Sequence, residues 1–196
     1  MTLKNRRFSR FPTWLRLLNS RFFEFGKDAR ELRASVREEI RVRPGLLVEI
    51  GCGFGINARL REGDYLGLDP DPRVIEAARQ RNPGRRFETL DGADLGLPDG
   101  SAAVALFVLT LHETPREDME RVLAEARRVA KNVLVFDYNT RLAGLSGLWI
   151  RLNERADFRD YLAFDIAGTM ERAGWRLAAD QKINRTFHKW VFSKGA

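Results

Sequence analysis

The chain has 196 residues, 44% hydrophobic and 31% charged, with a formal net charge of +7 at pH 7. This length fits one domain, or one domain with an extension, and is sufficient to bury a core. The longest apolar run, 102–111, is too short to span a bilayer, and no apolar signal segment follows the basic N-terminus. The single cysteine, Cys52, excludes an intrachain disulfide and a cysteine-rich zinc cluster. We therefore expect a cytoplasmic protein without a metal site.

The positive charge is concentrated near the N-terminus. Residues 1–43 carry twelve Lys/Arg and five Asp/Glu, whereas residues 44–196 carry 22 of each. Aromatic and apolar residues recur at helical spacing over 11–25, and a second helix is expected from Asp28, which can cap it, to about Arg41. The chain is therefore divided into a basic amphipathic helical extension or lid, 1–43, and a domain, 44–196. The charge indicates either an anionic partner or a solvated helix face.

Strands and short helices alternate after the break at Pro44-Gly45. Apolar stretches of strand length predict strands over 46–50, 65–68, 86–90, 103–109 and 133–136. Helical patterns lie between them, over 56–61, 72–81 and from Pro115 to about 129. This alternation predicts a parallel, doubly wound sheet with right-handed crossovers.

The regular alternation of strands and helices ends in the last third of the chain. An apolar, glycine-containing insert is expected over 139–157. One helix and two closing strands follow, over 158–173, 175–183 and 186–192. The predicted fold class is therefore α/β, with a doubly wound, mostly parallel seven-stranded sheet and an N-terminal helical extension.

The most informative segment is Leu46–Gly55, where an apolar strand runs into a glycine-rich loop. Fourteen residues past Gly55, Asp69 ends a second apolar stretch. In an α/β sheet such glycines let the backbone approach a nucleoside cofactor, and the acid accepts hydrogen bonds from ribose hydroxyls. A dinucleotide site would have a third glycine where this chain has Ile56, and Glu49 would repel a pyrophosphate. A compact cofactor with positive charge fits better.

At these residues the chain resembles the class I S-adenosylmethionine-dependent methyltransferases. The first motif of that family resembles Val48–Gly55, its ribose-binding acid matches Asp69, and its third motif resembles residues 90–101. Three motifs in order within a β/α rhythm make this match specific. The resemblance implies a Rossmann-like methyltransferase fold and S-adenosylmethionine as cofactor. By the same match, the cofactor-binding residues would be Glu49, Gly51, Cys52, Gly53, Gly55, Asp69, Pro70, Asp91, Gly92 and Phe107.

The resemblance also implies a role for several of these residues. Gly51 and Gly53 would lie against the methionine half of the cofactor. Glu49 would act on the amino group of the methionine, directly or through water. Asp91 would accept a hydrogen bond from the adenine amino group, with the backbone of Gly92 against the ring.

Some positions depart from the family pattern or allow a purely structural interpretation. The departures are framework positions, at Leu90, Ala102-Ala103 and 130–132. The glycines alone could form a tight turn, Asp69 could be a helix N-cap, and Asp91 could be a turn residue. Cys52 is interpreted as a small loop residue rather than a nucleophile, because no catalytic partner is evident.

The candidate catalytic residue is His112. The segment Phe107–His112 matches the family's strand that lies along the methionine and faces the substrate. A histidine at the carboxyl end of a central strand could take a proton from a hydroxyl or amine acceptor, or could simply line the pocket. Asp137 and Tyr138, at the end of the next strand, are further pocket candidates. Methyl transfer to an amine or soft nucleophile could also proceed by proximity and alignment alone.

The acceptor is sought in the N-terminal helix and in the 139–157 insert. The main hypothesis is a small-molecule or lipid-like acceptor, with residues 1–25 in peripheral contact with an anionic membrane. An RNA methyltransferase that uses the basic arm is an alternative. A non-catalytic cofactor-binding domain is a third, which the intact set of Glu49, Asp69 and Asp91 disfavours.

Overall fold

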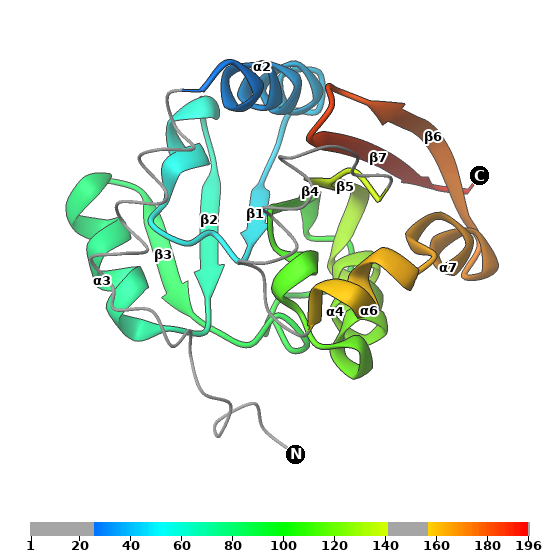
Figure 1. The fold of residues 1–196 in the computed structure, drawn as a ribbon. Coiled ribbons are helices and arrows are strands. Elements are labelled where there is room, and N and C mark those ends of the chain that lie inside the picture. Colours follow the sequence, from blue (N-terminus) through cyan, green and yellow to red (C-terminus); the bar gives the residue numbers. More distant parts are fainter. Residues whose placement is uncertain (1–25, 141–156, 196) are drawn as a thin grey trace.

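A computed structural model of the protein describes residues 26–140 and 157–195. Its centre is one seven-stranded sheet with the order β3-β2-β1-β4-β5-β7-β6 (Figure 1). The strands are β1 (Leu47–Ile50), β2 (Tyr65–Asp69), β3 (Arg86–Thr89), β4 (Ala102–Val108), β5 (Ala130–Tyr138), β6 (Trp175–Lys182) and β7 (Phe187–Lys194). Strands β1 to β5 pair in parallel, whereas β7 is antiparallel to both β5 and β6. The predicted mostly parallel, seven-stranded α/β fold is confirmed.

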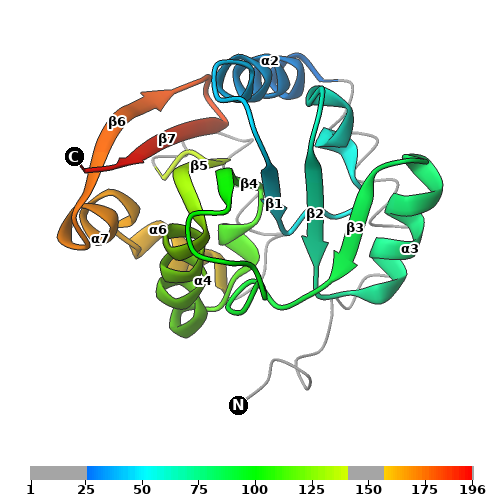
Figure 2. The ribbon, with the colours of Figure 1, turned by 180° about the vertical axis from the view of Figure 1, so that it is seen from behind.

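Helices flank this sheet. They are α2 (Lys27–Arg41), α3 (Pro72–Arg81), α4 (Arg116–Val129), α6 (Asp157–Ala163) and α7 (Ile166–Arg172), with short 3₁₀ helices η2 (Ile56–Leu60) and η3 (Leu111–Glu113). Helix α3 lies beside β3, while α4, α6 and α7 lie in the other half of the molecule (Figure 1). Figure 2 shows α2 next to the turn that joins β6 and β7. The predicted helix over 11–25 and residues 141–156 of the predicted insert lie outside the described residues.

Helix α2 is built into the same core as the sheet. Its buried residues form one stripe at helical spacing, Ala29, Leu32, Val36 and Ile40. Polar contacts with β7 and the turn before it fix the helix further. Lys189 Nζ donates to Glu39 Oε1 at 2.7 Å, and Thr186 Oγ1 donates to Asp28 Oδ2 at 2.6 Å. This part of the expected 1–43 extension therefore shares the core of the domain.

Three local expectations are wrong. Gly26, not Asp28, is the N-cap of α2, and the Asp28 carboxylate instead accepts a hydrogen bond from Thr186. The predicted helix over 158–173 is divided into α6 and α7, because the Asp165 side chain accepts a hydrogen bond from Gly168 N and so starts a new helix. The expected 133–136 strand begins at Ala130, directly after α4, without a separate turn.

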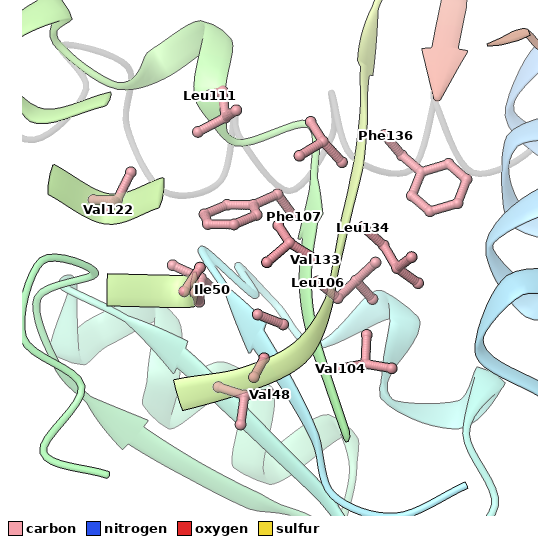
Figure 3. Close-up of a cluster of buried hydrophobic side chains, with 14 of the residues drawn as sticks. Val48, Ile50, Val104, Leu106, Phe107, Leu111, Val122, Val133, Leu134 and Phe136 are labelled. Carbon is pink, nitrogen blue, oxygen red and sulfur yellow. The ribbon is translucent and has the colours of Figure 1, made fainter. Parts of the chain in front are cut away.

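The centre of the core lies along β4 and the two strands that pair with it, β1 and β5. All residues of β5 from Val133 to Tyr138 are buried, as a strand between two others and under helices should be. Phe107 lies in this core, near Ile50, Leu111 and Val122 (Figure 3). The apolar centre holds the carboxyl ends of the parallel strands in fixed positions, and the candidate site residues follow directly from those ends.

Candidate active site

The glycine loop turns sharply at the carboxyl end of β1. The amides of Gly51 and Cys52 both donate to the carbonyl of Leu68, at 2.8 and 2.9 Å, which ties the loop to β2. Gly51, Gly53 and Gly55 have φ angles of 71°, 52° and 68°, in the left-handed region that side chains rarely adopt. A Cβ added at Gly53 would meet no atom within 4 Å. The loop is therefore open at Gly53, where a ligand can approach the backbone.

The other two glycines are needed for close packing inside the protein. A Cβ at Gly51 would lie 2.4 Å from Cγ2 of Thr110, a residue just past β4. A Cβ at Gly55 would lie 2.7 Å from Nδ2 of Asn82 and 2.8 Å from Cζ of Phe87. Because Gly51 has no side chain, the end of β4 can pack against the loop. For the same reason Gly55 lets α3 and β3 pack there.

Asp69 links the end of β2 to the glycine loop. Its Oδ2 accepts a hydrogen bond from Gly53 N at 3.1 Å, and its Oδ1 accepts one from Asp71 N at 3.0 Å. The side chain that caps α3 is Asp71, which accepts from Arg73 N, so Asp69 is not the N-cap. Pro70, between the two acids, is exposed. The carboxylate of Asp69 therefore lies beside the open part of the loop.

Glu49, in β1, is buried just before the glycine loop. Only 1% of the residue is exposed. Its Oε1 accepts a hydrogen bond from Asn57 Nδ2 at 2.7 Å, and its Oε2 pairs with the Tyr65 hydroxyl at 2.5 Å. Burial raises the pKa of Glu49 to about 7, although the hydrogen bonds from Tyr65 and Asn57 oppose this shift. In this arrangement the carboxyl group supports the loop through β2 and η2.

Asp91 and Gly92 follow the end of β3 on the same side of the sheet. Oδ1 of the half-buried Asp91 accepts a hydrogen bond from Ala93 N at 3.0 Å, as in an Asx turn. A Cβ at Gly92 would lie 3.0 Å from Cγ2 of Ile50. These two residues therefore lie next to the end of β1, beside the start of the glycine loop.

Five of the predicted cofactor-binding residues are buried, namely Glu49, Cys52, Gly55, Asp69 and Phe107. Phe107 is 0% exposed and packs in the core (Figure 3). Cys52 is 5% exposed, and burial raises the pKa of its thiol far above the usual range. Only the backbone of Cys52 can serve a ligand, and its thiol is not a nucleophile.

His112 pairs with Asp137 at the ends of two neighbouring strands. His112 Nδ1 lies 2.8 Å from Asp137 Oδ1. Asp137 Oδ2 accepts hydrogen bonds from the amides of Leu111 and His112, at 2.9 and 3.3 Å. In the tautomer with the proton on Nδ1, the imidazole donates to this carboxylate.

Aromatic rings from β5 and α6 surround the imidazole. The ring centroid of Tyr138 lies 4.7 Å from that of His112, and those of Phe158 and Tyr161 lie at 6.3 Å. Burial, and to a lesser extent Asp137, raises the pKa of Tyr161 well above its usual value, so its hydroxyl stays protonated and donates to Tyr138 O. His112 therefore lies in an aromatic environment, two residues after Thr110, which packs on Gly51 of the glycine loop.

Two residues at the end of β4 were not recognised from the sequence. Leu109 has a φ of 54°, which is unfavourable for a branched side chain. Such strain is found where function needs a particular backbone path. Thr110 Oγ1 donates to Ile50 O at 3.2 Å and packs on Gly51. Only the proximity of Leu109 and Thr110 to His112 in the sequence could have drawn attention to them.

Within 26–140 and 157–195 there is no group of three or more His, Cys, Asp or Glu arranged to hold a metal ion. In the same part of the chain no helix has the length and apolar character needed to cross a membrane.

Comparison with known proteins points to one family. Residues 48–134 match the model of a family described as "Methyltransferase domain". A trans-aconitate 2-methyltransferase from Methylobacterium radiotolerans is 37% identical over 86 residues, which are 41% of this chain and 32% of that protein. A phosphatidylethanolamine N-methyltransferase from Cereibacter sphaeroides is 26% identical over 119 residues, which are 56% of this chain and 57% of that protein. The chain thus spans less than two thirds of either relative.

Solved structures with a similar fold also include a methyltransferase. The magnesium protoporphyrin IX methyltransferase of Synechocystis PCC 6803, solved with bound S-adenosylhomocysteine, superposes with a TM-score of 0.65 at 14% identity. The match covers 92% of this chain and 94% of that protein. At this identity the likeness concerns the fold. The match to the family model over residues 48–134 shows that this part of the chain belongs to the class I S-adenosylmethionine-dependent methyltransferases.

Proposed function

We propose that this protein transfers a methyl group from S-adenosylmethionine to a small-molecule or lipid-like acceptor. The observation that carries the proposal is the His112–Asp137 pair beside the glycine loop. Thr110 links the two, because it packs on Gly51 and lies two residues before His112. The expected donor site and a candidate proton acceptor therefore lie at the same edge of the sheet, which is where open α/β sheets bind their ligands.

The residues at this edge fit the cofactor that the family implies. Gly53 leaves its backbone open, and Asp69 lies beside it with a carboxylate suited to ribose hydroxyls. Asp91 and the backbone of Gly92, next to Ile50, would hold the adenine, and Gly51 and Cys52 would contribute backbone only. Glu49 would act by positioning β1 and η2. When bound, S-adenosylmethionine supplies an electrophilic methyl group on a positively charged sulfur.

His112 would act as the general base. With its Nδ1 beside Asp137, the imidazole would accept the proton of a hydroxyl or amine acceptor. Asp137 would be a positioning residue that fixes the tautomer and the ring orientation. The aromatic rings of Tyr138 and Phe158 around the imidazole exclude water and favour an acceptor with an apolar part.

The relatives are named for three classes of acceptor, of which two fit this proposal and the third is a protein, ribosomal protein L11. One relative is named for trans-aconitate and another for phosphatidylethanolamine, a small acid and a lipid. The apolar surroundings of His112 are compatible with either. For a lipid acceptor we propose a cytoplasmic protein in peripheral contact with an anionic membrane through residues 1–25. RNA methylation through the same basic arm, and cofactor binding without catalysis, are the alternatives to be tested.

A screen with methyl-labelled S-adenosylmethionine against small carboxylic acids, phenols, amines, phospholipids and RNA tests the proposal. The chain has two histidines, which provide a matched control. His188 pairs with Asp180 instead, although it lies opposite Asp137 in the pairing of β5 with β7, so it tests whether the effect is specific to His112. We expect labelling of a small or lipid-like acceptor that His112→Ala abolishes and His188→Ala retains. Labelling of RNA alone, or no labelling despite S-adenosylhomocysteine binding, would contradict the proposed function.

A further inference from the structure

One carboxylate oxygen of Asp118 is buried without a donor in the described part of the chain. Asp118 lies in the first turn of α4 and is 5% exposed. Its Oδ1 accepts a hydrogen bond from Arg121 Nη1 at 3.2 Å, whereas its Oδ2 has no hydrogen-bond partner among residues 26–140 and 157–195. Burial of a carboxylate oxygen without a donor costs free energy. The position of this oxygen therefore indicates a donor that comes from a ligand.

The capping of α4 does not account for this carboxylate. Pro115 is the N-cap residue, so Asp118 occupies the third position of the helix. An acidic side chain at this position can reach back to the N–H of the N-cap residue, but proline has no N–H to donate. The positive end of the helix favours the negative charge of Asp118 and still leaves Oδ2 without a hydrogen.

The loop after β3 runs along α4 in the direction of the helix. A Cβ at Gly92 would lie 3.3 Å from Cγ1 of Val122, and Leu95 N donates to Glu125 Oε1 at 2.9 Å. From Gly92 to Leu95 the loop thus advances along α4 by about one helical turn, away from its N-terminus. The residue before Gly92 therefore lies toward the first turn of the helix.

Asp91 and Asp118 thus lie toward the same end of α4. Asp91 directly precedes Gly92, and Asp118 precedes Val122 by four residues on the buried stripe of the helix. Two carboxylates that approach each other repel unless a donor lies between them. An amino group has two hydrogens to donate and can satisfy one oxygen of each acid. The two acids therefore suit a ligand that carries an amino group.

We propose that Asp118 accepts one hydrogen of the adenine amino group of the cofactor, and that Asp91 accepts the other. This inference rests on the adenine site proposed above at Asp91 and Gly92. It adds a residue of α4 that selects an amino purine, because a purine with oxygen in place of the amino group would leave Oδ2 of Asp118 without a donor.

Calorimetry of the full chain with two ligands tests this inference. The ligands are S-adenosylhomocysteine and S-inosylhomocysteine, in which oxygen replaces the amino group of the purine. The test variant is Asp118→Ala, and the matched control is Glu120→Gln, which removes the same charge from an exposed position of α4. We expect Asp118→Ala to bind S-adenosylhomocysteine about tenfold more weakly and to lose about tenfold of the preference for it over S-inosylhomocysteine. The control should bind both ligands as the wild type does.

Thermal melting without a ligand separates this role of Asp118 from a structural one. Asp118→Ala removes a buried oxygen that has no donor, and the lost pairing with the exposed Arg121 contributes little. The unliganded variant should therefore melt at or above the temperature of the wild type, whereas the rise in melting temperature on adding S-adenosylhomocysteine should be smaller. A lower melting temperature with an unchanged preference between the two ligands would overturn the inference.

The binding results also show which proposal fails. If the wild type does not bind S-adenosylhomocysteine, both the cofactor site and this inference are overturned. If Asp69→Ala weakens binding and Asp118→Ala does not, or if Glu120→Gln weakens it as much as Asp118→Ala, only this inference is overturned. Asp118→Asn replaces Asp118→Ala if the latter does not fold. It should lose the same preference, because its amide can donate to the oxygen of S-inosylhomocysteine.

Discussion

His112 Nδ1 lies 2.8 Å from Asp137 Oδ1, although the two residues are 25 positions apart in the chain. The parallel pairing of β4 with β5 brings them together, since each follows or ends one of these strands. The same carboxylate accepts the amide hydrogen of Leu111, so it holds both the imidazole and the backbone that carries it. The orientation of the imidazole is therefore fixed before any acceptor arrives.

The His112–Asp137 pair predicts a coupled loss of activity. His112→Ala should lower kcat by roughly 10²–10⁴-fold, the usual contribution of a positioned base. Asp137→Asn should lower kcat in the wild type but cause little further loss in the His112→Ala background, because its effect passes through the imidazole. Single-turnover rates with a validated acceptor would measure both effects. Independent, additive losses would contradict a positioning role for Asp137.

A comparison of Gly51 with Gly53 tests the geometry of the loop. Gly51→Ala places a methyl group 2.4 Å from Thr110 Cγ2 and should destabilise the fold by roughly 2–4 kcal/mol. Gly53→Ala meets open space, so it should cost only about 1 kcal/mol of left-handed strain. It should nevertheless weaken cofactor binding, because the methyl group points to the open side.

Urea denaturation and S-adenosylhomocysteine titration separate these effects of the two glycines. Thr110→Ala removes the atoms that clash with the new methyl group, so it should partly rescue the stability of Gly51→Ala. Equal stability losses for the two glycine variants, with no rescue, would show that the loop has a different shape.

The sequence predicted the positions of the strands well, because the apolar runs that form them are continuous and bounded by glycine and proline. It also predicted that Asp69 ends the second strand, next to the glycine loop. It could not predict that Asp165 would divide the last helical segment, since an aspartate within a helical pattern can equally be a solvated residue. The choice between a cap and an exposed position depends on how α7 packs against β6.

The role of a site residue was harder to predict from the sequence where that role depends on the direction of its side chain. Phe107 belongs to the right strand but turns into the core, because a strand buried on both faces gives no periodic signal. Asp137 was recognised only as a pocket candidate, since its pairing with His112 depends on the register of β4 against β5. Glu49 lies in the predicted motif, yet its contacts with Asn57 and Tyr65 depend on tertiary packing.

The pKa of Glu49 predicts an unusual dependence of stability on pH. Burial raises this pKa from 4.5 to about 7 in the folded state. The folded protein therefore favours the protonated carboxyl group, and the stability it contributes is complete below about pH 4.5 and lost as the pH rises through 7. Glu49→Gln, which mimics the protonated form, should remove this loss, worth roughly 3 kcal/mol at most. Urea denaturation across this pH range measures it.

Glu39 provides a control of opposite sign. Burial alone would raise the pKa of Glu39, but hydrogen bonds from Lys189 and Arg43 outweigh it and lower the pKa. Its contribution to stability is therefore present above the ordinary pKa and lost as the pH falls. Glu39→Gln should destabilise the protein most at neutral pH. If Glu49→Gln behaved in the same way, Glu49 would be ionised in the folded protein.

Arg61 should be important for the attachment of α2. This buried arginine donates to the carbonyls of Ile40 and Arg43, at 3.0 and 3.2 Å, and to that of Gly45. Arg61→Ala leaves these carbonyls at the end of α2 without their donor and should cost roughly 2–4 kcal/mol. Arg86→Ala, at an exposed position on β3, should change the free energy of unfolding by no more than about 0.5 kcal/mol. Equal effects would contradict this role for Arg61.

Calorimetric titration of S-adenosylhomocysteine into the wild type and Asp69→Ala tests the central claim most directly. Asp64→Ala, at an exposed position before β2, is the matched control, and thermal melting verifies that each variant is folded. We predict that the wild type and Asp64→Ala bind alike and that Asp69→Ala binds at least about tenfold more weakly, since a carboxylate that accepts ribose hydrogen bonds is lost. Unchanged affinity in Asp69→Ala, or binding of NAD in place of S-adenosylhomocysteine, would contradict the account.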